Sequence, residues 1–304
     1  VIADLSDKEI INDKDIIELS FELKPIENQW IRKDNSPDYI YIGNSDINLS
    51  YNKGLKIIKN YLNHNLKSEF VLFDSIDIYM ESKIKGEKIN FIEIDNSGNY
   101  CEKIVNFKKE KNIVFILKND NINFVAKQRK FIQFIDNKQI NAPVISKKVY
   151  FDNFNETLIK SSIDFGPLLI DGLIDGAIIS NNKILNGKLV DIVFGIFQAS
   201  RSRVFKTEYI SCPSCGRTLF DIQEVTTKIK KLTNHLKGLK IGIMGCIVNG
   251  PGEMSDADYG YVGTGIDKVS LYKGQQIVKK SIPSKNAVDE LIKLIKENGD
   301  WIES

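Results

Sequence analysis

The sequence predicts an α/β protein of two domains, an incomplete (β/α) barrel-like domain over residues 1–200 and a smaller α/β domain over residues 201–304. The chain of 304 residues is too long for one ordinary domain and long enough for two. Short apolar runs alternate with helix-like segments through the first 200 residues. Three of the four cysteines then fall within 35 positions of one another.

The first domain is expected to hold five to seven strands separated by helices. The candidate strands are Tyr39–Ile42, Phe70–Phe73, Ile89–Ile94, Ile113–Leu117, Pro143–Ser146, Pro167–Ile170 and Ala177–Ile179. The candidate helices are Lys53–Asn63, Ser75–Lys85, Asn121–Asp136, Phe154–Ser162 and Asn186–Ser200. Strands that alternate with helices pair in parallel. Because eight complete units are not found, we expect an incomplete barrel with a structural role. The first 35 residues carry no prediction.

The second domain is expected to open with a strand, a helix and a second strand. The strands are Glu208–Ser211 and Leu239–Met244. Thr218 is expected to cap the helix between them. Its apolar residues recur every three or four positions: Ile222, Val225, Ile229, Leu232 and Leu236. The later elements are a hairpin and a final helix: Lys268–Tyr272, Gln276–Ser281 and Ser284 to about Asn298.

The three neighbouring cysteines are expected to meet at one edge of this sheet. The two strands of a strand–helix–strand unit lie parallel, so their carboxyl ends share an edge. Cys212 follows the first strand, Cys246 follows the second, and Cys215 stands before the expected helix. Ligands commonly bind at this edge of α/β sheets. The positive N-terminal end of the helix would favour thiolate over thiol.

Three thiolates without a clear fourth favour a 4Fe–4S cluster over zinc, at about two to one. His235 is expected at the far end of the helix, whereas His64 and Cys101 lie in the other domain. Glu253 is by default a solvated loop acid, and its functional interpretation is an oxygen ligand on the fourth iron. The glycine-rich stretch 249–252 would bring backbone amides close to the cluster sulfurs.

Composition excludes several other classes of function. A hydrophobic content of 42% and a charged content of 27% are typical of globular proteins. The net charge of +2 gives no indication of nucleic-acid or anionic-membrane binding. No apolar run reaches the roughly 18 to 20 residues that span a bilayer.

The stretches TEYISCPSCGRTLFDIQEVTTKI and IGIMGCIVNGPGEMSDADYGYVGTG closely resemble the plant-type 4-hydroxy-3-methylbut-2-enyl diphosphate synthases of the methylerythritol phosphate pathway of isoprenoid (terpenoid) biosynthesis. The match is strong over residues 206–263. In the first domain, only GPLLIDGLIDGAII (residues 166–179) resembles the family. The resemblance implies an oxidoreductase in which Cys212, Cys215, Cys246 and Glu253 bind a 4Fe–4S cluster. It places Asn249 beside the cluster, where it contacts substrate.

The resemblance also implies a reaction, an electron donor and a compartment. The substrate is 2-C-methyl-D-erythritol 2,4-cyclodiphosphate, which is opened and dehydroxylated by two electrons. The implied donor is ferredoxin, and the implied compartment is a plastid or apicoplast. A homodimer is also considered. The barrel with which the family binds the diphosphate is not found here, so we expect this chain to be inactive alone.

Other charged and glycine-rich segments receive plainer interpretations. Arg201 and Arg203 are expected to form a solvated helix end, not a substrate contact. Gly263-Thr264-Gly265 is expected to be a turn, because it lacks the full nucleotide-loop pattern. The lysine-rich segments 108–111 and 227–231 are most simply solvated faces. The second, with Lys228 and Lys230, is also a candidate docking surface for an acidic ferredoxin.

Two alternative functions stay open on the sequence. One is a zinc-binding interaction module without chemistry of its own. The other is an electron-transfer domain like those of sulfite or nitrite reductases, which would need a fourth cysteine at the cluster or a cysteine that bridges to a haem iron.

Overall fold

The computed structural model describes residues 1–61, 68–95, 100–118, 123–218 and 220–303. The chain divides into two compact units, Val1–Arg203 and Val204–Ser304, and each is described separately. No helix in the described part of the chain is long and apolar enough to cross a membrane.

The first unit is built on a nearly closed, barrel-like parallel sheet. Within the described residues it has eight strands, in the order β1 (Ile2–Asp4), β5 (Tyr39–Gly43), β7 (Ile57–Asn60), β8 (Phe70–Phe73), β9 (Ile89–Asp95), β10 (Ile113–Lys118), β11 (Val144–Val149) and β12 (Gly176–Ser180). All neighbouring pairs run parallel. At the open side of the sheet, the hydroxyl of Ser180 on β12 donates to the carboxylate of Asp4 on β1. The barrel-like fold expected from the sequence is therefore confirmed, although the sheet has eight strands in its described residues and not the expected five to seven.

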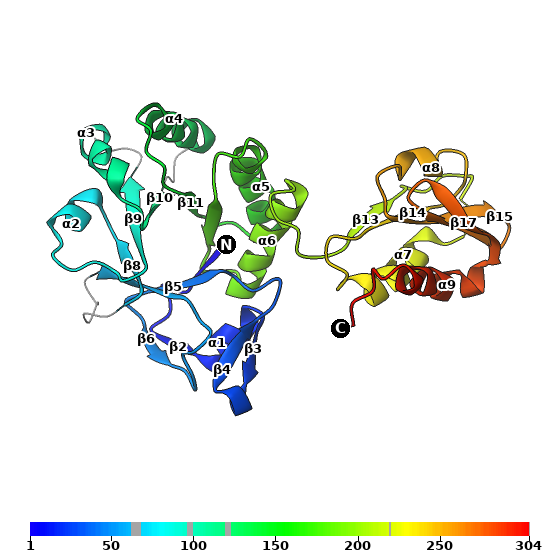
Figure 1. The fold of residues 1–304 in the computed structure, drawn as a ribbon, viewed down its shortest axis with the longest axis horizontal. Helices are drawn as coiled ribbons and strands as arrows, with labels where there is room; N and C mark the ends of the chain where they lie inside the picture. The colour runs from blue at the N-terminus through cyan, green and yellow to red at the C-terminus, as the bar shows by residue number, and fades with distance from the viewer. Residues whose placement is uncertain (62–67, 96–99, 119–122, 219, 304) are drawn as a thin grey trace. The chain divides into compact units, whose positions relative to one another are not determined.

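Helices stand around the outside of this sheet (Figure 1). They are α2 (Ile76–Glu81), α3 (Cys101–Ile104), α4 (Phe124–Asn137), α5 (Phe154–Ile170) and α6 (Asn186–Ala199), with the 3-10 turn Val105–Lys109 after α3. Four of the five predicted helices thus exist, although their ends differ from the prediction. Residues 121 and 122, the first two of the predicted helix Asn121–Asp136, lie outside the described residues.

Alternation along the strands builds the barrel interior. One residue in two points inward, and these residues form one buried apolar cluster: Ile2, Tyr41, Ile58, Phe70, Leu72, Phe91, Val114, Ile116, Ile145 and Ile178. The alternate residues, such as Phe73 and Phe115, are also buried, because the helices cover the outer face. Strands buried on both faces read as continuous apolar runs, which is why the sequence revealed most of them.

The first 35 residues, which carried no prediction, form the opening of the barrel and a small attached layer. After β1 come β2 (Ile10–Asn12), α1 (Asp13–Glu18), β3 (Phe21–Lys24), the 3-10 turn Pro25–Glu27 and β4 (Gln29–Arg32). β3 and β4 form an antiparallel hairpin, and β2 pairs in parallel with β6 (Asp46–Asn48). Trp30 anchors this layer, because its ring is buried and its indole N–H donates to the carbonyl of Tyr51 at 2.9 Å.

Two predicted elements of the first unit are wrong. Pro167–Ile170 is the last turn of α5, not a strand. Phe165, Leu168 and Leu169 are buried while Ile170 is 70% exposed, which is the burial pattern of a helix. Lys53–Asn63 is not a helix in its described part, because it contains strand β7, whose Ile58 fills the barrel interior. Residues 62 and 63 lie outside the described residues.

The expectation that Arg203 is solvated is also wrong. Its guanidinium lies 2.6 Å from the carboxylate of Asp38. The same carboxylate forms a second ion pair, with Arg32, at 2.6 Å. The same guanidinium lies 5.0 Å from the ring of Phe194. Burial raises the pKa of Asp38, whereas the hydrogen bond and the charge of the Arg203 guanidinium lower it. Arg203 therefore fastens the end of the first unit to its own sheet.

The second unit has a five-stranded mixed sheet in its described residues. The strand order is β13 (Glu208–Ser211), β14 (Lys240–Met244), β15 (Tyr259–Gly265), β16 (Lys268–Lys273) and β17 (Gln276–Pro283). β13, β14 and β15 run parallel, and β15, β16 and β17 are antiparallel. Gly263-Thr264-Gly265, expected as a turn, is instead the end of β15.

Helices cover both faces of this sheet (Figure 1). α7 (Ile222–Thr233) and α9 (Ser284–Glu297) pack on one face over an apolar core that includes Ile229, Tyr261 and Leu291. The short helix α8 (Gly250–Glu253) lies on the other face, where a second cluster contains Met244, Met254, Ala257, Val262 and Tyr272. Cys212 contacts both clusters, so the packing of the unit fixes the position of its backbone.

Candidate metal centre

One cavity at the carboxyl edge of the second sheet collects all the predicted site residues. Its volume is about 160 Å³. It is lined by Cys212, Pro213, Ser214, Cys215, Arg217, Met244, Cys246, Asn249, Gly250 and Glu253. β13 ends just before Cys212 and β14 ends two residues before Cys246, as the parallel strand–helix–strand argument predicts. The structure thus brings together the three cysteines, Glu253 and Asn249.

Cys212 is tied to the neighbouring strand through both its backbone and its sulfur. Its backbone N–H donates to the carbonyl of Ile243 at 3.2 Å. Its Sγ accepts a hydrogen bond from the backbone N–H of Gly245 at 3.3 Å. Gly245 stands directly before Cys246, so this bond connects the segments that carry two of the thiols.

Thr218 organises the loop of Cys215 and does not cap the helix. Its Oγ1 accepts from the backbone N–H of Cys215 at 3.0 Å, and its own N–H donates to the carbonyl of Cys215 at 2.9 Å. The predicted cap was therefore wrong. Asp221 caps α7 instead, because its carboxylate accepts from the N–H groups of Gln223 and Glu224 at 2.9 and 3.0 Å.

A source of positive charge other than the helix end also acts on Cys215. Cys215 lies six residues before Asp221, the cap of α7. Hydrogen bonds from the backbone N–H and then the guanidinium of Arg217 lower the pKa of the Cys215 thiol. Sequence reasoning missed Arg217, although its place two residues after Cys215 was a usable signal.

α8 positions the loop that carries Asn249 and Glu253. The backbone N–H of Glu253 donates to the carbonyl of Asn249 at 3.0 Å, which closes one helical turn. Gly250 permits that turn to lie on the sheet, because a Cβ there would stand 2.7 Å from the Cβ of Met244. The side chains of Asn249 and Glu253 are exposed at the cavity.

The thiols and the carboxylate stand around the wall of one cavity and do not meet at a single point. Among the described residues, no three Cys, His, Asp or Glu side chains converge closely enough to hold a single metal ion. A tetrahedral zinc needs its thiolates at about 2.3 Å. A 4Fe–4S cluster spreads its ligands over four irons, so it accepts thiols around the wall of a larger cavity.

The remaining candidate ligands do not join this cavity. The ring of His235 accepts or donates a hydrogen bond at 2.9 Å to the carbonyl of Ile302 and packs edge-on against Trp301. It is not among the residues that line the cavity, as predicted. His64 and the side chain of Cys101 lie outside what the structure describes.

Comparison with known proteins gives the same assignment for this domain. Residues 208–297 match the model of the GcpE protein C-terminal domain. A protein of Parabacteroides distasonis named 4-hydroxy-3-methylbut-2-en-1-yl diphosphate synthase (flavodoxin) is 44% identical over 268 residues, which are 88% of this chain and 44% of that protein. Residues 208–297 therefore belong to this domain family, and the chain is similar to that synthase over 88% of its length.

Other relatives have the same name as the Parabacteroides synthase. The synthase of Bacteroides fragilis is 48% identical over 204 residues, 66% of this chain and 33% of the relative. The synthase of Leptospira interrogans is 40% identical over 273 residues, 83% of this chain and 40% of the relative. The chain thus spans less than half the length of the synthases it matches. An alignment of 268 residues exceeds the second unit, so the similarity extends into the barrel-like unit.

Proposed function

We propose that this chain is the cluster-bearing part of a longer 4-hydroxy-3-methylbut-2-en-1-yl diphosphate synthase. Cys212, Cys215, Cys246 and Glu253 would hold a 4Fe–4S cluster, and the barrel-like unit would act as a spacer. One observation carries the proposal. The three thiols and the carboxylate line a single cavity within a domain that matches the GcpE C-terminal model.

The donor set fits the chemistry of such a cluster. Thiolates hold cluster irons firmly, and a carboxylate is a harder and weaker ligand for iron. When bound, the cluster supplies single electrons to a substrate that reaches its fourth iron. Glu253 is exposed on the loop of α8, so its side chain is free to give way to a substrate oxygen. Asn249 lines the same cavity and would contact that substrate.

Two further groups beside the cysteines would stabilise negative charge. The N–H of Gly245 donates to Sγ of Cys212, and such bonds to sulfur shift a cluster's reduction potential. The guanidinium of Arg217 interacts most strongly with Cys215, through a hydrogen bond and its charge. Its charge also acts on Cys246 and Glu253. A cation at this point offsets the charge of the thiolates and favours an anionic substrate.

The reaction proposed is the two-electron reductive opening and dehydroxylation of 2-C-methyl-D-erythritol 2,4-cyclodiphosphate. The relatives' names support the synthase activity, and their greater length supports a division of labour. In that division the rest of the longer protein would bind the diphosphate. This chain by itself would then be inactive, as the sequence predicts.

Flavodoxin is the electron donor we propose, in place of the ferredoxin expected from the plant-type resemblance. The names of the relatives described above specify flavodoxin. Lys230 lines a groove that also includes Cys212 and Pro213, so a basic side chain borders the thiol loop. An acidic carrier docked there would come close to the cluster. The plastid or apicoplast location and the homodimer remain predictions.

A chimera tests the proposal. The part of the Parabacteroides synthase that this chain does not match would be joined to this chain and purified without oxygen. The cyclodiphosphate and reduced flavodoxin would then be supplied, and product formation measured. We expect turnover by the chimera, and none by its Cys246→Ala variant or by this chain alone. An iron-loaded, folded chimera without turnover would contradict the proposal.

A further inference from the structure

The inward-facing residues of the barrel-like unit change from apolar to polar at the carboxyl ends of its strands. Two positions beyond the buried Ile2, Ile58, Phe91, Ile116, Ile145 and Ile178 stand polar residues on the same face. They are Asp4, Asn60, Glu93, Lys118, Lys147 and Ser180. A barrel with a purely structural role would gain stability from apolar residues here, whereas barrels that bind ligands do so at this end.

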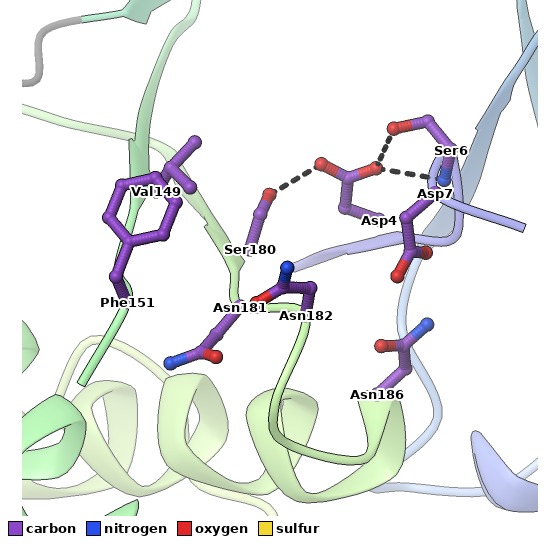
Figure 2. A pocket seen from close by; sticks show the side chains of 9 residues that line it. All are labelled: Asp4, Ser6, Asp7, Val149, Phe151, Ser180, Asn181, Asn182 and Asn186. Carbon is purple, nitrogen blue, oxygen red and sulfur yellow. Dashed lines mark hydrogen bonds between the residues drawn. The ribbon is translucent and has the colours of Figure 1, made fainter. Parts of the chain in front are cut away.

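One side of this polar end is hollow. A cavity of about 180 Å³ lies where β1, β11 and β12 end, beside the start of α6 (Figure 2). Its walls are formed by Asp4, Ser6, Asp7, Val149, Phe151, Ser180, Asn181, Asn182 and Asn186. This cavity belongs to the first unit and shares no residue with the cavity of the cysteines.

The charge of the walls disfavours an anionic ligand. Asp4 is held in place by the hydroxyl of Ser180 and by the N–H and hydroxyl of Ser6 (Figure 2). Asp7 lies beside it, and no lysine or arginine is among the lining residues. Lys183 stays outside the lining, and its ammonium group donates to the carbonyl of Phe151 at 2.8 Å. A phosphate or carboxylate would therefore meet uncompensated negative charge.

An unpartnered amide disfavours a purely cationic ligand. The side-chain Nδ2 of Asn186 is buried and has no hydrogen-bond partner, so a ligand in the cavity reaches it once this side chain turns toward the opening. Figure 2 shows this amide directed toward the side of the cavity where Asp7 lies. A buried donor without an acceptor costs free energy, and an ammonium group offers no acceptor. A hydroxyl group does both, because it donates to carboxylates and accepts from the amide.

The remaining wall is apolar. Phe151, which is 67% exposed, and Val149 stand opposite the aspartates and asparagines (Figure 2). An exposed aromatic ring facing amides and carboxylates offers a surface for C–H groups and partners for hydroxyls at once. We propose that this cavity binds a small neutral polyhydroxylated molecule, a sugar or sugar alcohol. The barrel-like unit would then be a ligand-binding domain as well as a spacer.

Titration followed by NMR of this chain tests the proposal. The probes are erythritol, xylitol and D-glucose, with butylamine and inorganic phosphate for comparison. Thermal shifts are avoided, because polyols stabilise proteins by exclusion from their surface. We expect saturable shifts of the amide signals of Ser180 and Asn186 with at least one polyol, and none with butylamine or phosphate.

Matched variants locate the binding. Asn186→Ala removes an unsatisfied group, so its free energy of unfolding should stay equal or rise while polyol affinity falls about fivefold. Asn182→Ala should also weaken binding, whereas Asn137→Ala, an exposed asparagine of α4, should not. The proposal is overturned if no polyol saturates these signals, if butylamine or phosphate binds better, or if both cavity variants bind as the parent does.

Discussion

The backbone N–H of Gly245 donates to Sγ of Cys212 at 3.3 Å, and so joins the ends of two parallel strands at a sulfur atom. The glycine leaves this amide free to approach the thiol, and its neighbour Cys246 carries the next thiol. The geometry of the sheet edge therefore controls the geometry of the cysteines. Changes in the sheet beneath them should act on metal binding as well as on stability.

Gly263→Ala should disturb the cysteine loop through the backbone of Gly245. A Cβ at Gly263 would stand 2.4 Å from the carbonyl oxygen of Gly245, which is backbone and cannot rotate away. We expect a loss of about 1–3 kcal/mol in the free energy of unfolding, measured in urea, together with less iron per chain. Gly265→Ala is the control, because its nearest neighbour would be 3.8 Å away. Equal effects of the two changes would contradict the account.

Arg217→Leu should raise the pKa of the Cys215 thiol in metal-free protein. The backbone N–H of Arg217, which leucine retains, and its guanidinium, which leucine lacks, both lower that pKa, so the parent chain holds more thiolate at a given pH. The rate of alkylation of Cys215 by iodoacetamide, followed by peptide mass spectrometry, should reach half its maximum at higher pH in the variant. Arg217→Lys should lie between the two. An unchanged profile would show that the guanidinium has no effect on the thiol.

Asp221→Ala and Thr218→Ala should have different consequences. Asp221 caps α7, so its loss should cost about 1 kcal/mol of folding free energy. Thr218 holds the loop of Cys215, so its loss should reduce iron and sulfide content more than stability. Urea unfolding and metal analysis on both variants separate these effects. The reverse pattern would restore Thr218 as the helix cap.

Lys147→Met should destabilise the barrel-like unit. The ammonium group of Lys147 lies 3.1 Å from the carboxylate of Glu93, and the two side chains are only 10% and 15% exposed. Its removal leaves Glu93 with the weaker partner Lys118 at 3.6 Å, so we expect a loss of about 2 kcal/mol or more. Lys118→Met, at a side chain 42% exposed, should cost less than about 1 kcal/mol. Equal losses in calorimetry would refute this.

Lys230→Glu should slow electron delivery more than Lys228→Glu. Only Lys230 of the pair lines the groove that adjoins Cys212 and Pro213. Stopped-flow reduction by flavodoxin at low ionic strength should show the difference, and added salt should diminish it. Identical rates for parent and Lys230→Glu would exclude this groove as the docking surface.

Much of the fold was predictable because it depends on local patterns of apolar residues. The buried strands of the barrel, the helix α6 and the strand–helix–strand unit all have runs or periods that fix their type. The meeting of the cysteines followed from strand direction alone. Strand β7 was missed, because its flanking lysines and asparagines imitate a helical surface while Ile58 alone marks its inward face.

The remaining features depend on partners distant in the chain. Arg203 pairs with Asp38 across 165 positions, which no local pattern reveals. The glycines of β15 suggested a turn, yet Gly263 is small because the backbone of Gly245 lies against it. The choice of Asp221 over Thr218 as cap depends on how the cysteine loop folds around Thr218.

Purification without oxygen, with iron and sulfide counted beside the visible spectrum, tests the central claim most directly. The account predicts a brown protein with about four irons and four sulfides per chain. Glu253→Ala should retain the cluster with an altered EPR signal, and Cys246→Ala should lose it. A colourless protein that holds zinc at the same cysteines under these conditions would contradict the account.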